Sequence, residues 1–265
     1  MKLMKRSVKK TLRGLGYKLR KIGARGLPRS SLLSDPFLAQ HQIINSLSKT
    51  NICIFDVGAN KGQTARRYRS KFPTAEIYCF EPFPASIAEL KKQFSNDQRI
   101  HIVPKAVAQE KSVSTFYVNE FDATNSLLPR PTSDRRYYPR CAGPKGTIEV
   151  EVIDLDEFLR VSHISMIDIL KLDIQGGELN ALHGAESLLR AESISLIFTE
   201  MMFIPHYEGA PLFHEIWSFL SKFGYSLFNI YDLHTATNGQ IRYGDALFVS
   251  ESVRKNVINE FPEEP

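Results

Sequence analysis

The chain has 265 residues, of which 43% are hydrophobic and 24% charged, a composition typical of a globular protein with a large core. Its three cysteines are scattered, and this odd count argues against a disulfide framework and favours a reducing, cytoplasmic compartment. No Cys/His spacing suggests zinc. No stretch of about 18 consecutive apolar residues is present and no apolar region follows the basic N-terminus, so neither a transmembrane helix nor a secretory signal is predicted.

The positive charge of the chain is concentrated at its N-terminus. Eleven of the 34 Lys and Arg residues lie within residues 1–34, which contain no Asp or Glu. The rest of the chain therefore holds 23 basic against 29 acidic residues and is net acidic. A nucleic-acid-binding domain needs a basic face on its folded body, so this distribution argues against nucleic acid as a partner.

An amphipathic pattern lies within this basic segment. Five apolar residues share one face of a predicted helix whose other faces are rich in Lys and Arg. These residues are Val8, Leu12, Leu15, Leu19 and Ile22. Such a helix suits the surface of an anionic membrane, and it equally suits a basic cap on the folded domain. We expect residues 1–47 to form a basic helical extension and linker, with a short helix over 37–47.

From residue 51 onward, strand-like and helix-like segments alternate. Strands that alternate with helices of about 10–15 residues are typical of a parallel sheet with helices on both faces. The predicted strands are 52–57, 75–80, 100–107, 113–118, 147–152, 166–174, 194–200, 225–232 and 245–250. The predicted helices are 61–72, 85–94, 178–190 and 211–224. The last two strands are joined by "TNGQ", a hairpin-like turn signal.

Two segments do not fit this alternation. Residues 119–146 hold four prolines and five Lys or Arg residues without a clear period, and irregular connections of such length are often functional. Residues 253–265 end in "NEFPEEP" and are expected to form an acidic tail. We therefore expect one folded domain over residues 48–252.

The segment "DVGANKGQT", residues 56–64, ends the first strand and opens a helix. In doubly wound sheets a ligand lies beyond the carboxyl ends of the strands, where glycines let the backbone approach it. Glu81 ends the second strand, where a carboxylate can accept from both hydroxyls of a ribose. The third glycine of a dinucleotide motif and the pattern of a P-loop are both absent. S-adenosylmethionine, which has a ribose and no phosphate, fits these features, with Asp56 near its amino-acid end.

These segments resemble the FkbM-type S-adenosylmethionine-dependent methyltransferases. The resemblance covers residues 37–250 and rests on "IFDVGANKGQT", "IYCFEPFP", "TNSLLP", "VIDLDEFL", "ILKLDIQGGELNALHGAESLL", "TEMMFIPHYEGAPLF" and "GDALFV". The block "LKLDIQGGE" is similar to the family's most distinctive motif, Leu-Lys-Ile-Asp-Val-Glu/Gln-Gly-x-Glu. The resemblance implies a class I methyltransferase (Rossmann-like) fold: a seven-stranded, mostly parallel sheet flanked by helices, with an antiparallel last strand. It also implies O-methylation, often of sugars or polyketide-type hydroxyls.

The resemblance extends to individual residues. It assigns Asp56, Gly58, Asn60, Gly62 and Glu81 to the cofactor, and it places Asn125 and Ser126, which match the family's "SL" element, close to cofactor or substrate. The residues that we expect at the cofactor are Asp56, Gly58, Asn60, Gly62, Thr64, Glu81, Pro82, Asn125 and Ser126. Gln175 stands where many relatives carry Glu, and this variant is similar to members associated with surface-polysaccharide synthesis. A neutral residue there also weakens the case for a metal site built from two carboxylates at this turn.

Asp173 ends the strand that should lie beside the first strand at the switch point of the sheet, facing the transferred methyl group. A hydroxyl acceptor is a poor nucleophile while it keeps its proton, and a positioned base speeds such a step by about 10²–10⁴-fold. We therefore expect Asp173 to be the base, with Glu200 and His206 as further catalytic candidates. Asp173, Glu178 and Glu200 could instead hold a divalent cation, which the sequence leaves open, and Glu178 equally suits the first turn of a helix.

The basic loop suggests how an acceptor could be held. Arg135 and Arg136 could each bind phosphate through two hydrogen bonds, and Tyr137 could stack on a sugar or base. These contacts would suit a nucleotide-linked or phosphorylated sugar. The alternative is a solvated surface loop with no role in binding.

Together these features predict a cytoplasmic S-adenosylmethionine-dependent O-methyltransferase acting on a sugar hydroxyl in surface-polysaccharide or glycan biosynthesis. The basic helix could place it at the inner face of a membrane. An NAD-dependent oxidoreductase is the enzyme alternative, weakened by the missing glycine. A non-catalytic, membrane-docked binding protein on a nucleotide-binding scaffold is the alternative from another class.

Overall fold

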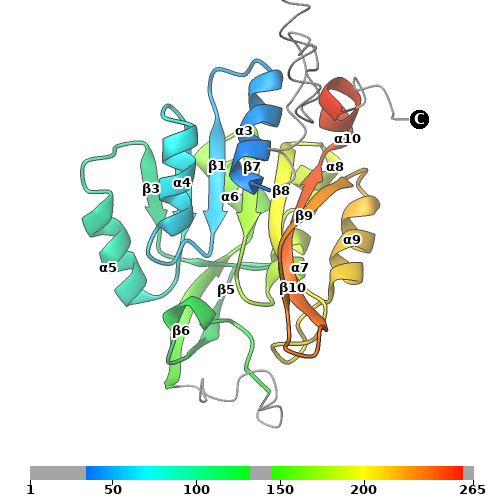
Figure 1. The fold of residues 1–265 in the computed structure, drawn as a ribbon. Coiled ribbons are helices and arrows are strands. Elements are labelled where there is room, and N and C mark those ends of the chain that lie inside the picture. The colour runs from blue at the N-terminus through cyan, green and yellow to red at the C-terminus, as the bar shows by residue number, and fades with distance from the viewer. Residues whose placement is uncertain (1–33, 132–144, 259–265) are drawn as a thin grey trace, which may run out of the picture.

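A seven-stranded sheet forms the centre of the molecule, which the computed structural model describes over residues 34–131 and 145–258 (Figure 1). The strands of this sheet, in spatial order, are β3 Ile100–Val103, β2 Glu76–Phe80, β1 Cys53–Val57, β7 Ile167–Leu172, β8 Ile194–Met202, β10 Ile241–Val249 and β9 Ser226–Thr235. The first five are parallel, and β10 is antiparallel to both of its neighbours. This arrangement confirms the predicted class I methyltransferase sheet with its antiparallel last strand.

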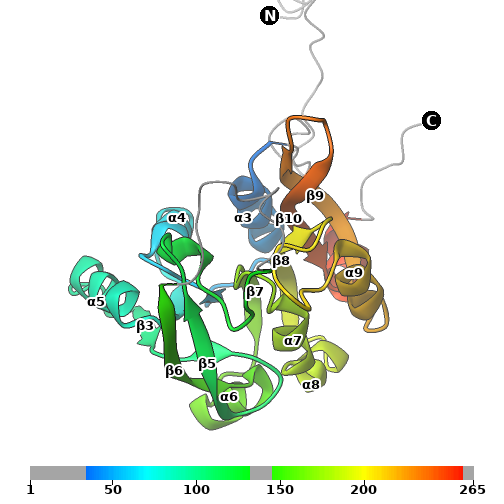
Figure 2. The same ribbon diagram turned by 90° about the horizontal axis from the view of Figure 1, so that it is seen from below.

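Helices cover both faces of this sheet (Figure 2). One face carries α3 Pro36–Ser46, α4 Gln63–Lys71, α5 Pro84–Gln93, α10 Glu251–Val253 and the helical turn η2 Arg254–Ile258. The other face carries α6 Leu155–Ser162, α7 Glu178–His183, α8 Glu186–Arg190 and α9 Phe213–Ser221. Side chains of a strand alternate between faces, so Ile169 packs in the first layer and Leu170 in the second. Every residue of β7 is buried, as expected for a parallel strand covered on both sides.

A second, three-stranded sheet lies at the carboxyl ends of the central strands (Figure 1). Its strands, in spatial order, are β4 Ala106–Val107, β6 Gly146–Ile153 and β5 Ser112–Val118. A short 3₁₀ helix, η1 Asp122–Thr124, follows β5. One face of this sheet is buried through Phe116 and Val150, and the other is exposed, which confirms the predicted half-exposed strands. The small sheet therefore stands where a ligand of the central sheet would bind.

Three local features differ from the sequence-based expectation. The strand expected over 100–107 divides at Pro104 into β3 and β4, which belong to different sheets. The helix expected over 178–190 breaks at Gly184, where a Cβ would overlap the backbone of Ala108. Helix α6 was not among the predicted helices. It begins at Asp154, whose carboxylate accepts from the backbone N–H of Glu157 (2.7 Å).

The packed body extends on both sides of residues 48–252. Helix α3 contributes Ile43 and Ile44 to the core, and the turns at residues 251–258 contribute Val253 and Val257. The basic segment 1–33 lies outside the described residues. Within the described part of the chain, no helix is both long and apolar enough to cross a membrane.

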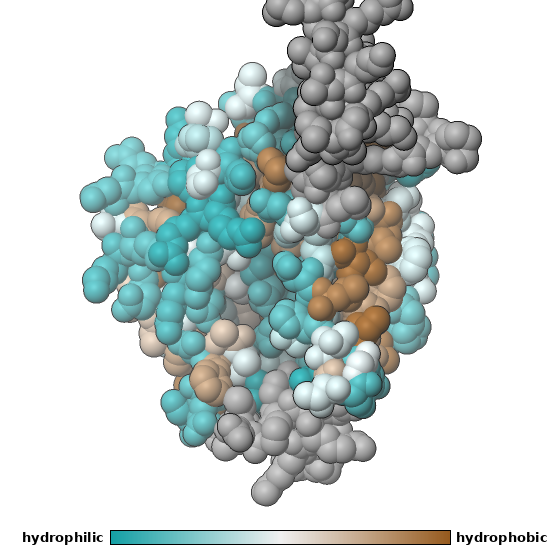
Figure 3. All heavy atoms as spheres, in the orientation of Figure 1, coloured by the Kyte–Doolittle hydropathy of each residue, from teal (hydrophilic) through white to brown (hydrophobic). Residues whose placement is uncertain are grey.

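The surface differs between the two ends of the sheet. Hydrophilic residues cover the side of α4 and α5, whereas apolar residues gather toward β9 and α9 (Figure 3). Strand β9 is one of the two edge strands of the sheet, and among the described residues it pairs only with β10. Leu233 of β9 and Trp217 of α9 belong to the exposed large apolar residues. On the face shown in Figure 3, the apolar residues therefore lie mainly toward the β9 end of the sheet.

Candidate active site

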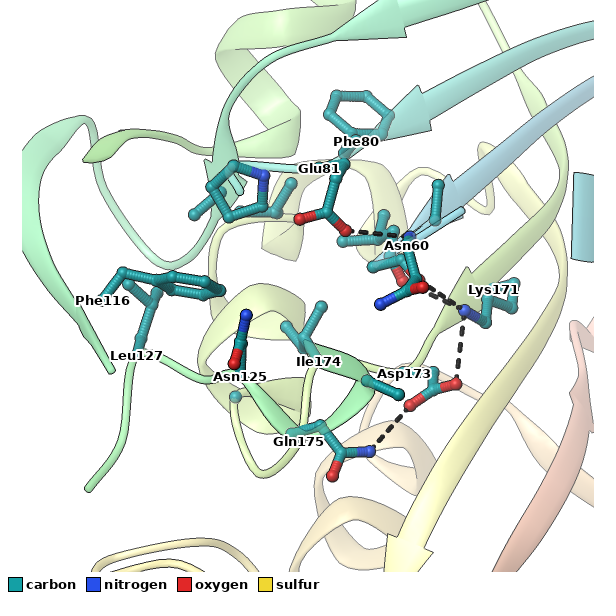
Figure 4. Close-up of a pocket in the computed structure, with 18 of the residues that line it drawn as sticks. Asn60, Phe80, Glu81, Phe116, Asn125, Leu127, Lys171, Asp173, Ile174 and Gln175 are labelled. Carbon is teal, nitrogen blue, oxygen red and sulfur yellow. Dashed lines mark hydrogen bonds and ion pairs between the residues drawn. The ribbon is translucent and has the colours of Figure 1, made fainter. Parts of the chain in front are cut away.

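A cavity of about 310 Å³ lies at the carboxyl ends of β1, β2 and β7 (Figure 4). This position is the switch point of the sheet, where doubly wound folds bind their ligands. Six of the nine residues expected at the cofactor line the cavity. They are Gly58, Asn60, Thr64, Glu81, Pro82 and Asn125. Asp56, Gly62 and Ser126 do not line it.

The turn between β1 and α4 forms one wall. Gly58 has a φ of +77°, and a Cβ there would overlap the carbonyl oxygen of Asp173. The backbone N–H groups of Gly58 and Ala59 donate to the carbonyl of Phe80 (3.0 and 3.1 Å), which fixes the turn against β2. Gly62, with a φ of +84°, caps the amino end of α4 behind this wall. Position 58 therefore requires glycine, because there the turn after β1 touches the turn after β7.

Glu81 follows β2 and is held by backbone donors. Its Oε2 accepts from the N–H of Asn60 (2.8 Å) and its Oε1 from the N–H of Phe83 (2.8 Å). Burial raises the pKa of Glu81 to about 7, although these two hydrogen bonds act in the opposite direction. Each carboxylate oxygen keeps a further lone pair, so this side chain can accept from the hydroxyls of a ribose.

The neighbouring walls fit the rest of a nucleoside. Phe116 of β5 and Leu127 line the cavity and offer apolar surface to an adenine ring (Figure 4). Phe80 of β2 also borders the cavity, but its ring is buried in the core against Phe55 and Phe158. Asn125 accepts from the backbone N–H of Asn119 (2.7 Å) through its Oδ1. Its buried Nδ2 has no hydrogen-bond partner among the described residues, so it is a donor available to a ligand in the cavity. These residues fit the expected S-adenosylmethionine.

A buried ion pair lies at the wall of the cavity, which Lys171 helps to line. Lys171 of β7 is 3.1 Å from Asp56 Oδ1 and 3.5 Å from Asp173 Oδ2, and it donates to the carbonyl of Gly58 (3.1 Å). Burial disfavours the ammonium, but the carboxylates of Asp56 and Asp173 outweigh it and raise the pKa of Lys171. Asp56 is fully buried, so it acts on the cavity through Lys171 and the turn at Gly58.

Asp173 is the catalytic candidate that lines the cavity. Glu200, on β8, lies behind the side chain of Gln175, whose amide nitrogen donates to both carboxylates. His206 is buried, lies outside the cavity lining and packs edge-on against Tyr243 (5.6 Å between ring centroids). Burial, followed by the charges of Arg242 and Arg130, lowers the pKa of His206 to about 4.

Glu178 turns back onto its own loop. Its Oε1 accepts from the N–H of Ile174 and its Oε2 from the N–H of Gly176, both at 2.9 Å. Burial raises the pKa of Glu178 to about 7. Over the described residues, no group of three or more His, Cys, Asp or Glu side chains is arranged to hold a metal ion. The three metal-ligand candidates, Asp173, Glu178 and Glu200, therefore do not converge on one point.

The remaining predicted site residues are Ser126, which lies behind the cavity, and the three acceptor residues of the basic loop. Ser126 donates from its Oγ to the carbonyl of Gln175 (2.8 Å) and so joins the loops after β5 and β7 behind the cavity. The predicted acceptor residues Arg135, Arg136 and Tyr137 lie outside the described residues.

Lys171 lines the cavity, and the sequence predicted no role for it. It is a charged residue in a strand that is otherwise apolar except for Asp168, and a buried charge requires a partner. A charged residue in an apolar strand therefore predicts an ion pair, but it does not identify the residue with which Lys171 pairs. Phe116 was predicted only as part of a strand, because nothing local shows that β5 reaches the cavity.

Comparison with known proteins identifies the family. The chain matches the model of the methyltransferase FkbM domain over residues 56–227. The 2-O-methyltransferase NoeI of Sinorhizobium fredii (strain NBRC 101917 / NGR234) is 27% identical over 190 residues, covering 69% of this chain and 76% of that protein. The methyltransferase sdnD of Sordaria araneosa is 26% identical over 164 residues, covering 52% of this chain and 61% of that protein.

Solved structures are more distant. TrmK of M. capricolum in complex with S-adenosyl-homocysteine aligns with a TM-score of 0.44 at 9% identity, covering 83% of this chain and 69% of that one. A likeness of this degree carries no argument about function.

The family match settles the class of protein. It spans more than half of the chain and includes the β1–α4 turn, Glu81 and the block that contains Asp173. It selects a methyltransferase over the NAD-dependent oxidoreductase and the non-catalytic binding protein, and it makes S-adenosylmethionine the cofactor. The chain belongs to the FkbM family of S-adenosylmethionine-dependent methyltransferases.

Proposed function

We propose that the protein methylates a hydroxyl group of a sugar in glycan biosynthesis. A relative named as a 2-O-methyltransferase supports oxygen as the acceptor atom. The observation that carries the proposal is the carboxylate of Asp173, which lines the cavity with 43% of its side chain exposed. A hydroxyl needs a base at this point, and Asp173 stands beside the residues that fit the cofactor.

In this mechanism Asp173 takes the proton of the acceptor hydroxyl while the oxygen forms its bond to the methyl carbon. Bound S-adenosylmethionine would supply that methyl group already activated on a sulfonium, with a neutral thioether as the leaving group once the carbon–sulfur bond is broken. Lys171 holds Asp173 Oδ2 in place through the ion pair, and Glu81 fixes the ribose. The walls of the cavity align the reactants and exclude competing water.

Transfer to defined sugars tests the proposal. The protein is incubated with S-adenosylmethionine and a panel of methyl glycosides of hexoses and 6-deoxyhexoses, and products are analysed by mass spectrometry. We expect at least one glycoside to gain the mass of a single methylation. Transfer to another acceptor class, with none to a glycoside, contradicts the sugar assignment. The same assay with EDTA reports whether a metal takes part.

The base is tested by Asp173→Asn. This variant should keep its affinity for S-adenosylmethionine and lose about 10²-fold or more in kcat, because the hydroxyl keeps its proton. Calorimetry with the cofactor controls for folding and binding. Unchanged turnover would refute the role of Asp173.

Further proposals rest on the sequence. Arg135, Arg136 and Tyr137 would contact the acceptor, and the acceptor KM of an Arg135→Ala/Arg136→Ala variant measures that contribution. The basic residues 1–34 would bind an anionic membrane from the cytoplasmic side, which co-sedimentation with anionic and neutral vesicles tests.

A further inference from the structure

Gln175 connects three segments around the cavity. Its Nε2 donates to Asp173 Oδ1 (3.0 Å) and to Glu200 Oε2 (2.8 Å). Its Oε1 is 2.8 Å from the hydroxyl of Tyr207, whose single hydrogen is shared between this oxygen and the carbonyl oxygen of Thr124 (3.0 Å). Figure 4 shows the amide nitrogen directed at Asp173. Both amide hydrogens and one side of the amide oxygen are therefore engaged, and the orientation of the amide is fixed by its partners.

The backbone of Gln175 is also held firmly. Its φ is +59°, in the left-handed region that non-glycine residues rarely adopt. Its carbonyl accepts from Ser126 Oγ (2.8 Å), and Ser126 Oγ accepts in turn from the N–H of Leu128 (2.9 Å). An unfavourable conformation persists where surrounding contacts determine it, and such positions cluster at functional sites.

The amide of Gln175 lies between the carboxyl groups of Asp173 and Glu200. Asp173 follows β7 and Glu200 belongs to β8, and two carboxylates in direct contact would repel each other. The two carboxyl groups share the Gln175 Nε2 donor. Burial, followed by the charge of Asp173, raises the pKa of Glu200. A neutral donor between them satisfies both acceptors, whereas a third carboxylate at this position could donate to neither.

We infer that Gln175 is a positioning residue, whose amide holds the Asp173 carboxylate toward the acceptor by tying it to Glu200 and Tyr207. The inference rests on the proposed role of Asp173 as the base. The side chain acts through Asp173 and not by its own contact with the substrate.

Gln175→Glu is the sharpest substitution for testing this inference. Glutamate has the same shape and can still accept from Tyr207, but it lacks the two donated hydrogens. With the best glycoside of the panel, we expect kcat to fall by about 10–100-fold, because the base is misplaced. The acceptor KM and the Kd for S-adenosylmethionine should change by less than about twofold. Gln240→Glu, in the exposed turn between β9 and β10, is the matched control and should behave as the wild type.

A double-mutant cycle separates positioning from direct contact. Asp173→Asn, Gln175→Glu and the double variant are compared by kcat, with thermal unfolding and cofactor calorimetry on each. If Gln175 acts through Asp173, the double variant should match Asp173→Asn within about twofold. Losses that multiply, or a wild-type kcat for Gln175→Glu, overturn the inference.

The outcomes distinguish this inference from the proposed function. A wild-type kcat for Asp173→Asn refutes the base itself. A slow Asp173→Asn together with an unimpaired Gln175→Glu refutes the positioning role alone. If Gln175→Glu shows no cooperative unfolding transition, Gln175→Met takes its place in the same cycle, because it keeps the length of the side chain without the charge.

Discussion

Glu81 binds two backbone N–H groups and faces the cavity, so its protonation state decides how it can hold a ribose. Burial raises the pKa of Glu81 to about 7. A protonated carboxyl loses acceptor capacity for a ribose hydroxyl, so the ionised form binds the cofactor better. We therefore expect the Kd for S-adenosylmethionine to decrease as the pH rises from about 6 to 8 and then to level off.

Calorimetry across this pH range checks the expectation. Glu81→Gln is the matched variant, because it keeps the shape of the side chain and cannot ionise. It should bind more weakly than the wild type at about pH 8 and show a nearly flat pH profile. Equal pH profiles in the two proteins would assign the effect to another group, such as Glu178, whose pKa is also about 7.

At the scale of single residues, the sequence predicts which positions lie near the cofactor better than how they act. Glu81 could be placed from the end of its strand, and it lines the cavity. Asp56 was expected near the amino-acid end of the cofactor, but it is buried against Lys171. That pair joins neighbouring strands that are far apart in the chain, and no local pattern reports such a contact.

The turn between β1 and α4 is the element on which the cavity depends most. Gly58→Ala would place a Cβ against the carbonyl of Asp173 in a backbone conformation with φ of +77°. Gly239 also has a positive φ, +85°, but a Cβ there has no atom within 4 Å. We expect Gly239→Ala to lose about 1 kcal/mol of unfolding free energy, and Gly58→Ala to lose at least twice as much.

Urea unfolding and cofactor calorimetry compare the two variants. Gly58→Ala should also weaken S-adenosylmethionine binding by about tenfold or more, because the turn lines the cavity, whereas Gly239→Ala should bind normally. Equal losses in the two variants would show that the backbone conformation alone matters. The contact between Gly58 and the carbonyl of Asp173 would then make no measurable contribution to the unfolding free energy.

At the scale of elements, strands follow from the sequence because their apolar runs are continuous. β1, β7 and β8 are covered on both faces, so periodicity and burial agree. Breaks are harder to predict. Gly184 interrupts a helical pattern because Ala108, distant in the chain, packs against it. The division at Pro104 depends on which sheet each half joins, and only the tertiary structure decides that.

At the scale of the whole molecule, folding buries several carboxyl groups and so makes stability depend on pH. Burial is the main cause that raises the pKa values of Glu81, Glu178 and Asp245 to about 7 each. Between about pH 4 and 7 the folded state binds more protons at these groups than the unfolded state, so the unfolding free energy falls as the pH rises. Glu151 has the opposite sign: the hydrogen bond from Lys105 lowers its pKa, and its contribution is lost in acid. Without cofactor, we expect these three groups to make the unfolding free energy decline between about pH 5 and 7.

Urea unfolding at several pH values between about 4 and 8 measures this profile. Asp245→Asn removes one of the three groups and should make the decline between about pH 5 and 7 shallower, whereas Glu110→Gln, at an exposed turn, should leave it unchanged. A stability that rises steadily to about pH 8 would contradict the assignment. Because S-adenosylmethionine selects the ionised form of Glu81, its binding should add more to the unfolding free energy at about pH 8 than at about pH 6. The cofactor would then stabilise the fold most in the pH range where buried carboxylates weaken it.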